Sequence, residues 1–380
     1  MARSVAEIEA MRPQWQHLPS GPNGDIDYYL AVLEAGGEAL RPHAVLVSRG
    51  GQPVTFAAAT VERLRLDWRI GYTTVLRPTV RCLTVPHGAI GGEPSEEDCR
   101  RLARTFQAAL AKGEADLLAV HELTADSPMV RALGTIPPVL CRDAFPQKGL
   151  RWTMSLPDSR EAFRRAQSKH ARTHMRYSWK RLQRREGRAS IRAFTDESDL
   201  DTVASDIEAV ALRTYQRRIG AGFVDGEATR RLMAFEMRRG WFRACVLYID
   251  GGPCAYRMGR RYGDTYYARQ TGYDPAFRKY GVGALLLDYD VERLCEEAGL
   301  RTIDFGFGDG EYKRRYGTAH RKESSIVVFA PTARGVLRNA ARSAVVGANV
   351  TLKLAAKRLA LFETLRRLAR RRRLASVEES

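Results

Sequence analysis

Residues 266–318 read YYARQTGYDPAFRKYGVGALLLDYDVERLCEEAGLRTIDFGFGDGEYKRRYGT, and the expected fold depends on this stretch. Residues 265–271 have the aromatic and β-branched character of a strand, and residues 283–298 that of a helix that Gly299 ends. Residues 302–305 have strand character again. The segment RKYGVGA, residues 278–284, lies between the first strand and the helix. This order predicts a mixed domain of helices and strands with a glycine loop at a helix N-terminus.

The glycine loop is typical of an anion site. Gly281 and Gly283 allow backbone N–H groups to converge at the start of the helix, and Arg278 and Lys279 add positive charge. A pyrophosphate is the natural ligand of such a loop. The loop is neither a P-loop, because no Gly-Lys-Ser/Thr follows, nor a GxGxxG motif, because Leu286 replaces the third glycine. A glycine turn that only caps the helix is the alternative interpretation.

The order of strand, RxxGxG/A loop, helix and strand resembles the acyl-CoA site of the GNAT acyltransferases. This resemblance implies that the loop binds the pyrophosphate of coenzyme A. It also implies that the strand at 266–271 splays from its neighbour, with backbone N–H groups near Gln270 and Thr271 stabilising the oxyanion. The cofactor-binding residues implied in this way are Gln270, Thr271, Arg278, Lys279, Tyr280, Gly281, Val282, Gly283 and Ala284.

The segment DFGFGDGEYKRRYG, residues 304–317, resembles a signature of the CelD-type acetyltransferases. These form a GNAT branch linked to cellulose and other exopolysaccharide production, and they are similar to the Fem-type peptidyltransferases. The resemblance covers about residues 150–325. It departs at residues 278–283, where the family often has a Ser-Pro-Gly loop and this chain has the plainer GNAT form. That departure favours a coenzyme A donor.

Acyl transfer from a thioester requires a deprotonated acceptor, a stabilised oxyanion and a protonated leaving thiolate. The resemblance implies a tyrosine as the acid, and Tyr312 is preferred over Tyr316 because it lies inside the signature. Lys313 is a candidate phosphate or oxyanion ligand. The candidate bases or acceptor anchors are Asp304, Asp309 and Glu311, of which Asp304 would be tested first. Each of these residues also has a purely structural alternative: Asp304 would cap a loop, Tyr312 would pack in the core, and Glu311 would be a surface charge.

Positive charge is concentrated in two segments. The chain has 62 Lys and Arg against 44 Asp and Glu, a net charge of +18, which argues against an ordinary acidic metabolic enzyme. Residues 160–190 hold eleven Arg or Lys and two Glu, and residues 331–375 hold twelve and one. Both segments are predicted to be helical. Nucleic acid, an anionic membrane, an acidic substrate or simple solvation would each explain them. Membrane contact is favoured for the leucine-rich tail.

The sequence gives little sign of a metal site or a disulfide framework. Its six cysteines lack CxxC spacing, which fits a reducing cytoplasm. His170 and His174 have helical spacing but no third ligand nearby, so no metal is expected. The opening residues 1–15 are polar, unlike a secretory signal, and no apolar run is long enough to span a membrane. We expect a cytoplasmic protein with peripheral contact to the inner face of the plasma membrane.

The two halves of the chain have a similar pattern. Residues 43–48 and 54–60 predict a hairpin around Gly50-Gly51, followed by a helix at 94–112 and a strand at 117–121. The second half repeats a hairpin around Gly251-Gly252, then a helix and a short strand. We therefore expect an α+β fold of two tandem GNAT-like halves, each with a mixed, mostly antiparallel sheet flanked by helices. Residues 1–150 form a degenerate half, 151–328 the acyl-CoA-binding catalytic half, and 329–380 a basic amphipathic helix.

Three functional hypotheses remain. The first is an acyl-CoA-dependent N- or O-acyltransferase, with acetyl-CoA as the default donor. Its acceptor would be a sugar, a lipid-linked saccharide or a polysaccharide precursor, acylated by direct transfer in a ternary complex. The second is a Fem-like ligase that uses aminoacyl-tRNA, with the basic 160–190 segment on RNA. The third is a catalytically inactive module that tethers an assembly to lipid or nucleic acid, against which the intact 278–284 loop argues.

Overall fold

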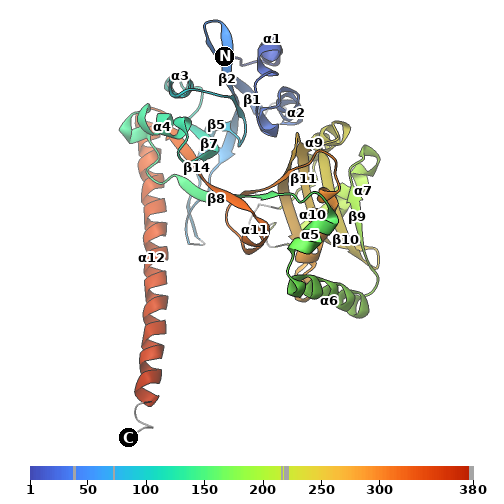
Figure 1. Ribbon diagram of the computed structural model, residues 1–380. Helices are drawn as coiled ribbons and strands as arrows, with labels where there is room; N and C mark the ends of the chain where they lie inside the picture. Colours follow the sequence, from blue (N-terminus) through green and yellow to red (C-terminus); the bar gives the residue numbers. More distant parts are fainter. Residues whose placement is uncertain (37–39, 72, 215–216, 218–221, 376–380) are drawn as a thin grey trace.

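The structure is a computed structural model that describes residues 1–36, 40–71, 73–214, 217 and 222–375. In the last helix, side chains are described up to Ala355 and at Arg358. The chain forms two lobes joined by long strands, and the last helix extends away from them (Figure 1).

The described part of the N-terminal half contains four α-helices and most of the strands of one lobe. Ser4 and Ser95 begin two of these helices with reciprocal capping boxes. Trp15, Phe56 and Phe106 are fully buried in its core. The elements are α1 (Val5–Trp15), α2 (Ile26–Gly36), β1 (Leu40–Arg49), β2 (Gln52–Arg65), β3 (Trp68–Ile70), β4 (Thr73–Leu76), β5 (Thr79–Val85), β6 (Ile90–Gly92), α3 (Glu96–Ala111), β7 (Leu117–Thr124) and α4 (Pro128–Thr135).

The C-terminal half is built in the same way. Its middle strands are buried on both faces, with α7 and α9 covering one face and α6 and α10 the other. The elements are β8 (Gln147–Ser155), α5 (Arg160–Ala166), α6 (Lys169–Glu186), β9 (Ala189–Phe194), α7 (Leu200–Ala211), α9 (Glu227–Arg238), β10 (Phe242–Ile249), β11 (Gly252–Tyr262), β12 (Thr265–Tyr273), the 3₁₀ helix η5 (Pro275–Tyr280), α10 (Val282–Cys295), β13 (Thr302–Phe307), α11 (Glu311–Tyr316), β14 (Ala319–Phe329) and α12 (Ala333–Ala375).

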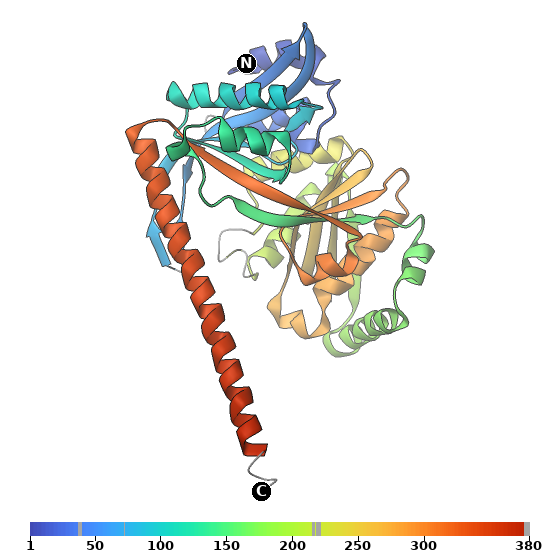
Figure 2. The same cartoon turned by 60° about the vertical axis from the view of Figure 1, so that its left-hand side comes forward.

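The two halves share one mixed sheet and exchange their last strands. The order is β1-β2-β5-β7-β14-β8-β13-β12-β11-β10-β9, with β6 beside β2. Strand β8 follows the first half in sequence but pairs with β13 of the second, and β14 follows the second half but pairs with β7 of the first. The two exchanged strands also pair with each other, and they cross between the lobes in Figure 2. The sheet of each half is therefore completed by the other half.

The duplication that the sequence predicts is visible in the fold. Each half has one parallel pair among its described strands: β5 with β7 in the first half and β12 with β13 in the second. In both halves a helix and then an exchanged strand follow this pair in the sequence. Both β7 and β13 carry a bulge at the corresponding place. The bulge residues with positive φ are Glu122 in β7, at 57°, and Gly306 in β13, at 75°. The expected α+β fold of tandem GNAT-like halves, flanked by helices, is confirmed.

The structure also departs from the expected organisation. The boundary placed at residue 150 falls inside β8, and the one at 328 falls inside β14, so both lie within exchanged strands. The single basic helix expected near 160–190 is two helices, α5 and α6. The sequence also predicts one helix at 198–217, whereas the described helix there, α7, ends at Ala211. Residues 215 and 216 of that expected helix lie outside the described residues.

The last helix packs on the N-terminal half only over its first turns. Asn339 donates to the carbonyls of Leu140 and Arg142 at 2.9 and 2.8 Å, and Arg338 pairs with Asp116 at 3.2 Å. Beyond the Asn349 side chain, which accepts from the Gly71 N–H, the helix projects from the lobes in both views (Figures 1 and 2). Of the leucine-rich face expected on this helix, Leu352 and Ala355 are described and exposed. The side chains of Ala356, Leu359, Leu361, Phe362 and Leu365 lie outside the described ones.

Candidate active site

Strands β12 and β13 diverge in the middle of the C-terminal half. They pair in parallel only from Thr265 to Tyr267 on β12 and from Thr302 to Asp304 on β13. Beyond that point β12 continues against β11, and β13 continues against β8. This is the splay that the resemblance implies. Backbone groups of β12 beyond Tyr267 therefore face a gap in the sheet, where a bound group can take the place of a strand.

The strand that opens the gap carries a bulge. Gly259 of β11 pairs with Ala268 and Met258 with Gln270, so Arg269 is an extra residue in β12. The Gln270 Oε1 atom is buried and has no hydrogen-bond partner among the residues the structure describes. The Thr271 hydroxyl donates to the Tyr256 carbonyl at 3.1 Å. Both predicted oxyanion positions therefore lie on the splayed part of β12.

The glycine loop adopts the geometry of an anion site. Gly281 is left-handed, at φ 65°, and links η5 to the first turn of α10. The N–H groups of Ala284 and Leu285 both donate to the Gly281 carbonyl. The first N–H groups of α10, those of Val282 and Gly283, precede the intrahelical bonds. A Cβ at Gly281 would meet nothing within 4 Å, so the turn is open on its outer side.

The basic helix α6 packs beside this loop. Its last residue, Glu186, pairs with Lys279 at 3.3 Å and accepts a hydrogen bond from the Tyr280 hydroxyl. The Tyr280 ring is buried and lies under Arg181. Tyr280 and Glu186 raise the pKa of Lys279, and this cation therefore stays charged at the loop. Arg278 is exposed on the same turn.

Asp304, the first candidate base, lies in a buried ion network. Both of its carboxylate oxygens accept from Arg151 Nη1 at 2.8 Å, and one accepts from the Gly306 N–H at 2.7 Å. The same guanidinium pairs with Glu323 at 2.8 Å and with Glu122. Asp304 is 4% exposed, so its charge is already compensated away from solvent. This geometry favours a positioning role for Asp304.

Lys313 holds the bulge of β13. Its ammonium donates to the carbonyls of Gly306 and Phe307, both at 2.9 Å, and its residue is 7% exposed. Burial, followed by the charge of Arg151, lowers its pKa. Lys313 and Tyr312 of α11 line the same cavity as Phe305, Gly306 and Phe307 of β13. Lys313 therefore stabilises the bulge of β13 that forms one wall of the cavity.

The two candidate tyrosines occupy different surroundings. Tyr312 is 37% exposed, lines the cavity and packs edge-on against Phe305, with ring centroids 6.0 Å apart. Tyr316 is buried, donates its hydroxyl to Asp288 at 3.2 Å and stacks on Phe163. Burial raises the pKa of Tyr316. Tyr312 is therefore the better placed of the two to meet a bound molecule.

The remaining predicted carboxylates lie on the surface. Asp309 accepts from Arg314 Nε at 2.9 Å and from Trp152 Nε1 at 3.2 Å. The Arg314 hydrogen bond lowers the pKa of Asp309. Glu311 is exposed at the start of α11. Neither residue lines the cavity that contains Tyr312.

A cavity of about 530 Å³ lies between the two halves. It brings the splay of β12 and β13 together with loops of the N-terminal half. The side chains and backbone that line it come from Pro22, Asn23, Pro86, His87, His121, Glu122, Arg151, Arg260, Tyr267, Ala268, Arg269, Phe305, Gly306, Phe307, Tyr312 and Lys313. Sequence reasoning found only the last two as site residues. For His87 the single signal was its place in a glycine-rich loop.

The histidine and carboxylate clusters do not lead us to assign a metal. The rings of His170 and His174 lie 6.4 Å apart on α6. Among the described residues, ligand atoms of His87, Glu122 and Glu323 lie within 4.8 Å of one another, close enough to bind one cation. Arg151 already pairs with both of these carboxylates. The expectation that the protein needs no metal stays a prediction.

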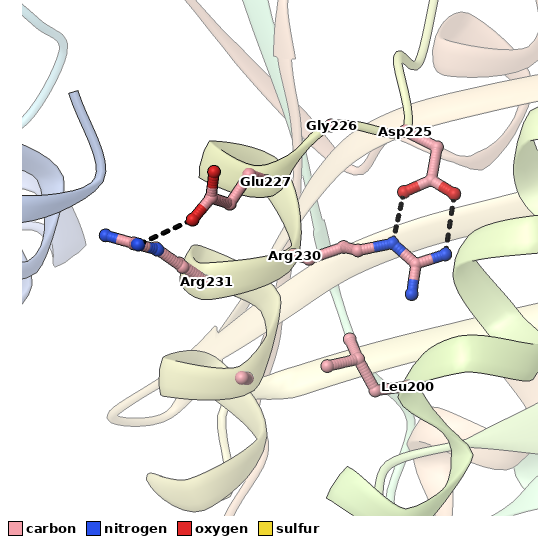
Figure 3. A pocket seen from close by; sticks show the side chains of 7 residues that line it. Leu200, Asp225, Gly226, Glu227, Arg230 and Arg231 are labelled. Carbon is pink, nitrogen blue, oxygen red and sulfur yellow. Dashed lines mark hydrogen bonds and ion pairs between the residues drawn. The ribbon is translucent and has the colours of Figure 1, made fainter.

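A second hollow, of about 510 Å³, is open to solvent at the N-terminus of α9 (Figure 3). Its charged groups are paired with each other. Asp225 binds Arg230 in a fork at 2.6 and 2.7 Å, and Glu227 accepts from Arg231 at 2.5 Å. None of the predicted site residues lines it.

The comparisons with known proteins agree with this geometry. Residues 169–314 match the family model of the acetyltransferase (GNAT) domain, so this part of the chain carries a GNAT domain. The match covers the glycine loop and the splayed strand but not the N-terminal half. No curated protein matches the sequence. The finer resemblance, to the CelD-type branch, stays a prediction.

Solved structures resemble nearly the whole chain at low identity. FemX superposes with a TM-score of 0.56 at 11% identity, over 87% of this chain and 97% of its own. The C-terminal domain of a putative lysylphosphatidylglycerol synthetase from Agrobacterium fabrum gives 0.52 at 13%, over 88% and 95%. A tandem GNAT protein from the clavulanic acid biosynthesis pathway gives 0.51 at 13%, over 88% and 98%. The tandem fold is therefore shared.

The described part of the chain holds no helix that is both long and apolar enough to cross a membrane.

Proposed function

We propose that this protein is an acyl-CoA-dependent acyltransferase whose acceptor binds in the cavity between the halves. The observation that carries the proposal is the divergence of β12 and β13 after Tyr267 and Asp304. This gap opens on the cavity that Tyr312 lines, and β12 leads directly into η5 and the Gly281 turn. A single ligand with a pyrophosphate at one end and a thioester at the other fits this sequence of elements. Acetyl-CoA is the default donor.

The acceptor, in this proposal, is an amine or hydroxyl of a sugar, a lipid-linked saccharide or a polysaccharide precursor. This part rests on the resemblance of residues 304–317 to the CelD-type signature. Direct transfer in a ternary complex is favoured in this proposal because the gap between β12 and β13, where the thioester would lie, opens on the cavity that would hold the acceptor. The basic tail, residues 331–375, would hold the enzyme at an anionic membrane surface where such acceptors are found.

Titration calorimetry with acetyl-CoA and with desulfo-CoA tests the donor. We expect saturable micromolar binding of both by the native chain, since the pyrophosphate provides most of the recognition. Gly281→Glu places a carboxylate at the anion site in a left-handed turn, and it should weaken binding more than tenfold. The matched control is Gly113→Glu, at φ 74° with equally open surroundings, far from the loop in the sequence. A native chain that binds neither ligand would overturn the proposal.

An aminoacyl-tRNA donor is the second candidate. The exposed cations of α6 lie beside the donor loop, where an RNA backbone would add contacts that coenzyme A does not make. FemX shares the fold, which allows this donor but does not favour it over acyl-CoA. Steeply salt-dependent binding of tRNA, together with no binding of acetyl-CoA, would select this candidate.

A further inference from the structure

The N-terminal half contributes a histidine to the cavity. His87 lies in the loop between β5 and β6, and this loop is held at three points. Asn23 Nδ2 donates to the His87 carbonyl at 2.8 Å, the Gly21 N–H to the Gly88 carbonyl at 3.1 Å, and the Ala89 N–H to the Pro86 carbonyl at 3.1 Å. The side chain is 24% exposed, toward a cavity that Tyr312 also lines. The backbone therefore fixes this imidazole in the cleft.

Both contacts of His87 Nδ1 are with acceptor oxygens of Glu122, and they determine which ring nitrogen carries the proton; the carboxylate Oε2 lies 4.0 Å away. Nδ1 lies 3.1 Å from the backbone carbonyl oxygen of Glu122. A carbonyl only accepts, so in the neutral ring Nδ1 is the protonated nitrogen and Nε2 has a free lone pair. Among the residues the structure describes, Nε2 has no hydrogen-bond partner. The imidazole thus presents an unprotonated nitrogen to which no described residue donates a hydrogen bond.

The residue that orients the ring is itself unusual. Glu122 has φ 57° in the bulge of β7, a left-handed conformation that costs a non-glycine residue energy. The Glu122 N–H donates to the Ser325 hydroxyl of the exchanged strand β14 at 3.0 Å, and this hydrogen bond holds the backbone in that conformation. The corresponding bulge of β13 uses a glycine, Gly306. The structure therefore keeps a strained residue at the point that supports His87.

The surroundings of His87 favour the neutral ring. Burial first, and the charge of Arg151 second, lower its pKa. Glu323 and Glu122 act in the opposite direction, but both already pair with Arg151. The other titratable groups that line the cavity are His121, Arg260, Tyr267, Arg269, Tyr312 and Lys313.

We propose that His87 is the general base of the reaction, with Nε2 accepting the proton of the acceptor nucleophile. This inference rests on the proposed acyltransferase function and assigns a step of it to the half that lacks the donor loop. The predicted carboxylates are less suitable. The Asp304 carboxylate is already paired with Arg151, and neither Asp309 nor Glu311 lines the cavity.

The step balances without any further reactant. The acceptor nitrogen or oxygen attacks the thioester carbonyl, a C–N or C–O bond forms, and its proton moves to Nε2 of His87. The carbonyl electron pair moves to oxygen and returns as the C–S bond breaks. The leaving thiolate takes a proton from the Tyr312 hydroxyl, and the imidazolium returns a proton to Tyr312 through water. The products are the acylated acceptor, the free thiol and a neutral His87.

The first test reads the imidazole directly and needs no acceptor. Long-range ¹H–¹⁵N spectra of the native chain, saturated with acetyl-CoA, are compared with those of His87→Gln to assign the ring. We expect a neutral ring protonated at Nδ1 at pH 7, with a titration midpoint below 6.5, its ordinary value. A ring protonated at Nε2, or a midpoint above 6.5, would overturn the base assignment.

The second test separates this inference from the function on which it rests. His87→Gln should bind acetyl-CoA as the native chain does, because the donor loop lies in the other half. With an amino-sugar acceptor from a screen, its kcat should fall by about 10²–10⁴ and its pH profile should lose the acid limb near the His87 pKa. His17→Gln, exposed outside the cavity, should match the native enzyme. A His87→Gln enzyme with native kcat would refute the base alone, whereas a native chain that binds no acetyl-CoA would refute the function.

Discussion

Arg151 Nη1 binds both carboxylate oxygens of Asp304 at 2.8 Å, and the two residues stand on the neighbouring strands β8 and β13. Through its other nitrogens the same guanidinium reaches Glu323 and Glu122. One buried cation therefore binds carboxylates from three strands, β7, β13 and β14, at the point where the halves exchange strands.

Loss of that cation should destabilise the whole chain. Arg151→Met would leave three carboxylates with no common partner, and removing one member of a buried ion pair costs about 3–5 kcal/mol. The free energy of unfolding in guanidinium chloride measures this cost. Arg164→Met breaks the exposed pair with Glu292 and should cost less than about 1 kcal/mol. Equal losses in the two variants would show that the network is not what joins the halves.

The two tyrosines of α11 should respond differently to loss of the hydroxyl. Tyr312→Phe should lower kcat by a factor of 10² or more while the KM for acetyl-CoA is retained, because the thiolate then lacks its acid. Tyr316→Phe removes a buried hydrogen bond to Asp288 and should instead cost about 1 kcal/mol of stability. Steady-state kinetics and thermal unfolding of both variants decide the assignment. The reverse pattern would make Tyr316 the acid.

Stability should fall on mild acidification. Burial is the first cause that lowers the pKa of His43, His87 and His121, so below pH 6.5 the unfolded chain binds more protons than the folded one. Each such histidine contributes up to about 1.4 kcal/mol of lost stability per pH unit. Unfolding midpoints at pH 7.5 and 5.5 measure the loss. His43→Gln should reduce it, because that variant removes one of the three buried histidines. A midpoint that is higher at pH 5.5 would contradict this prediction.

The distal part of α12 should be dispensable for folding but needed for membrane contact. Deletion of residues 352–380 removes nine Lys and Arg while it spares Asn339, Arg342 and Asn349, whose side chains contact the N-terminal half. The melting temperature should therefore be retained. Flotation with phosphatidylglycerol vesicles should show binding by the full chain only, with little binding of either form to phosphatidylcholine. Equal flotation of the two forms would show that the tail is not needed for membrane contact.

Local patterns predicted much of the fold. The hairpin around Gly50-Gly51 is β1 with β2, the hairpin around Gly251-Gly252 is β10 with β11, and the helix expected at 283–298 is α10. These elements are specified by turn residues and periodicity within about twenty positions. The glycine loop was recognised for the same reason, since Arg278 to Ala284 is contiguous, and its role in binding the donor stays a prediction.

The contacts that define the cavity are not local, and this is why they were missed. Asp304 looked like a free base, because its partner Arg151 lies 153 positions earlier in the chain. His87 belongs to no sequence motif. The orientation of its ring depends on the carbonyl of Glu122, 35 positions away in a strained bulge. The exchange of β8 and β14 has no signal in either strand alone. Such features depend on tertiary pairing, on which sequence periodicity carries no information.

The exchange of strands also affects synthesis on the ribosome. The edge of β7 is complete by Thr124, but its partner β14 spans Ala319–Phe329, near the end of the chain. Ribosomes add about 5–20 residues per second, so this edge waits on the order of 10–40 s for its partner. An unpaired strand edge is a template for association with other chains. The nascent chain would thus need a chaperone, or transient cover from β8, until translation is nearly finished.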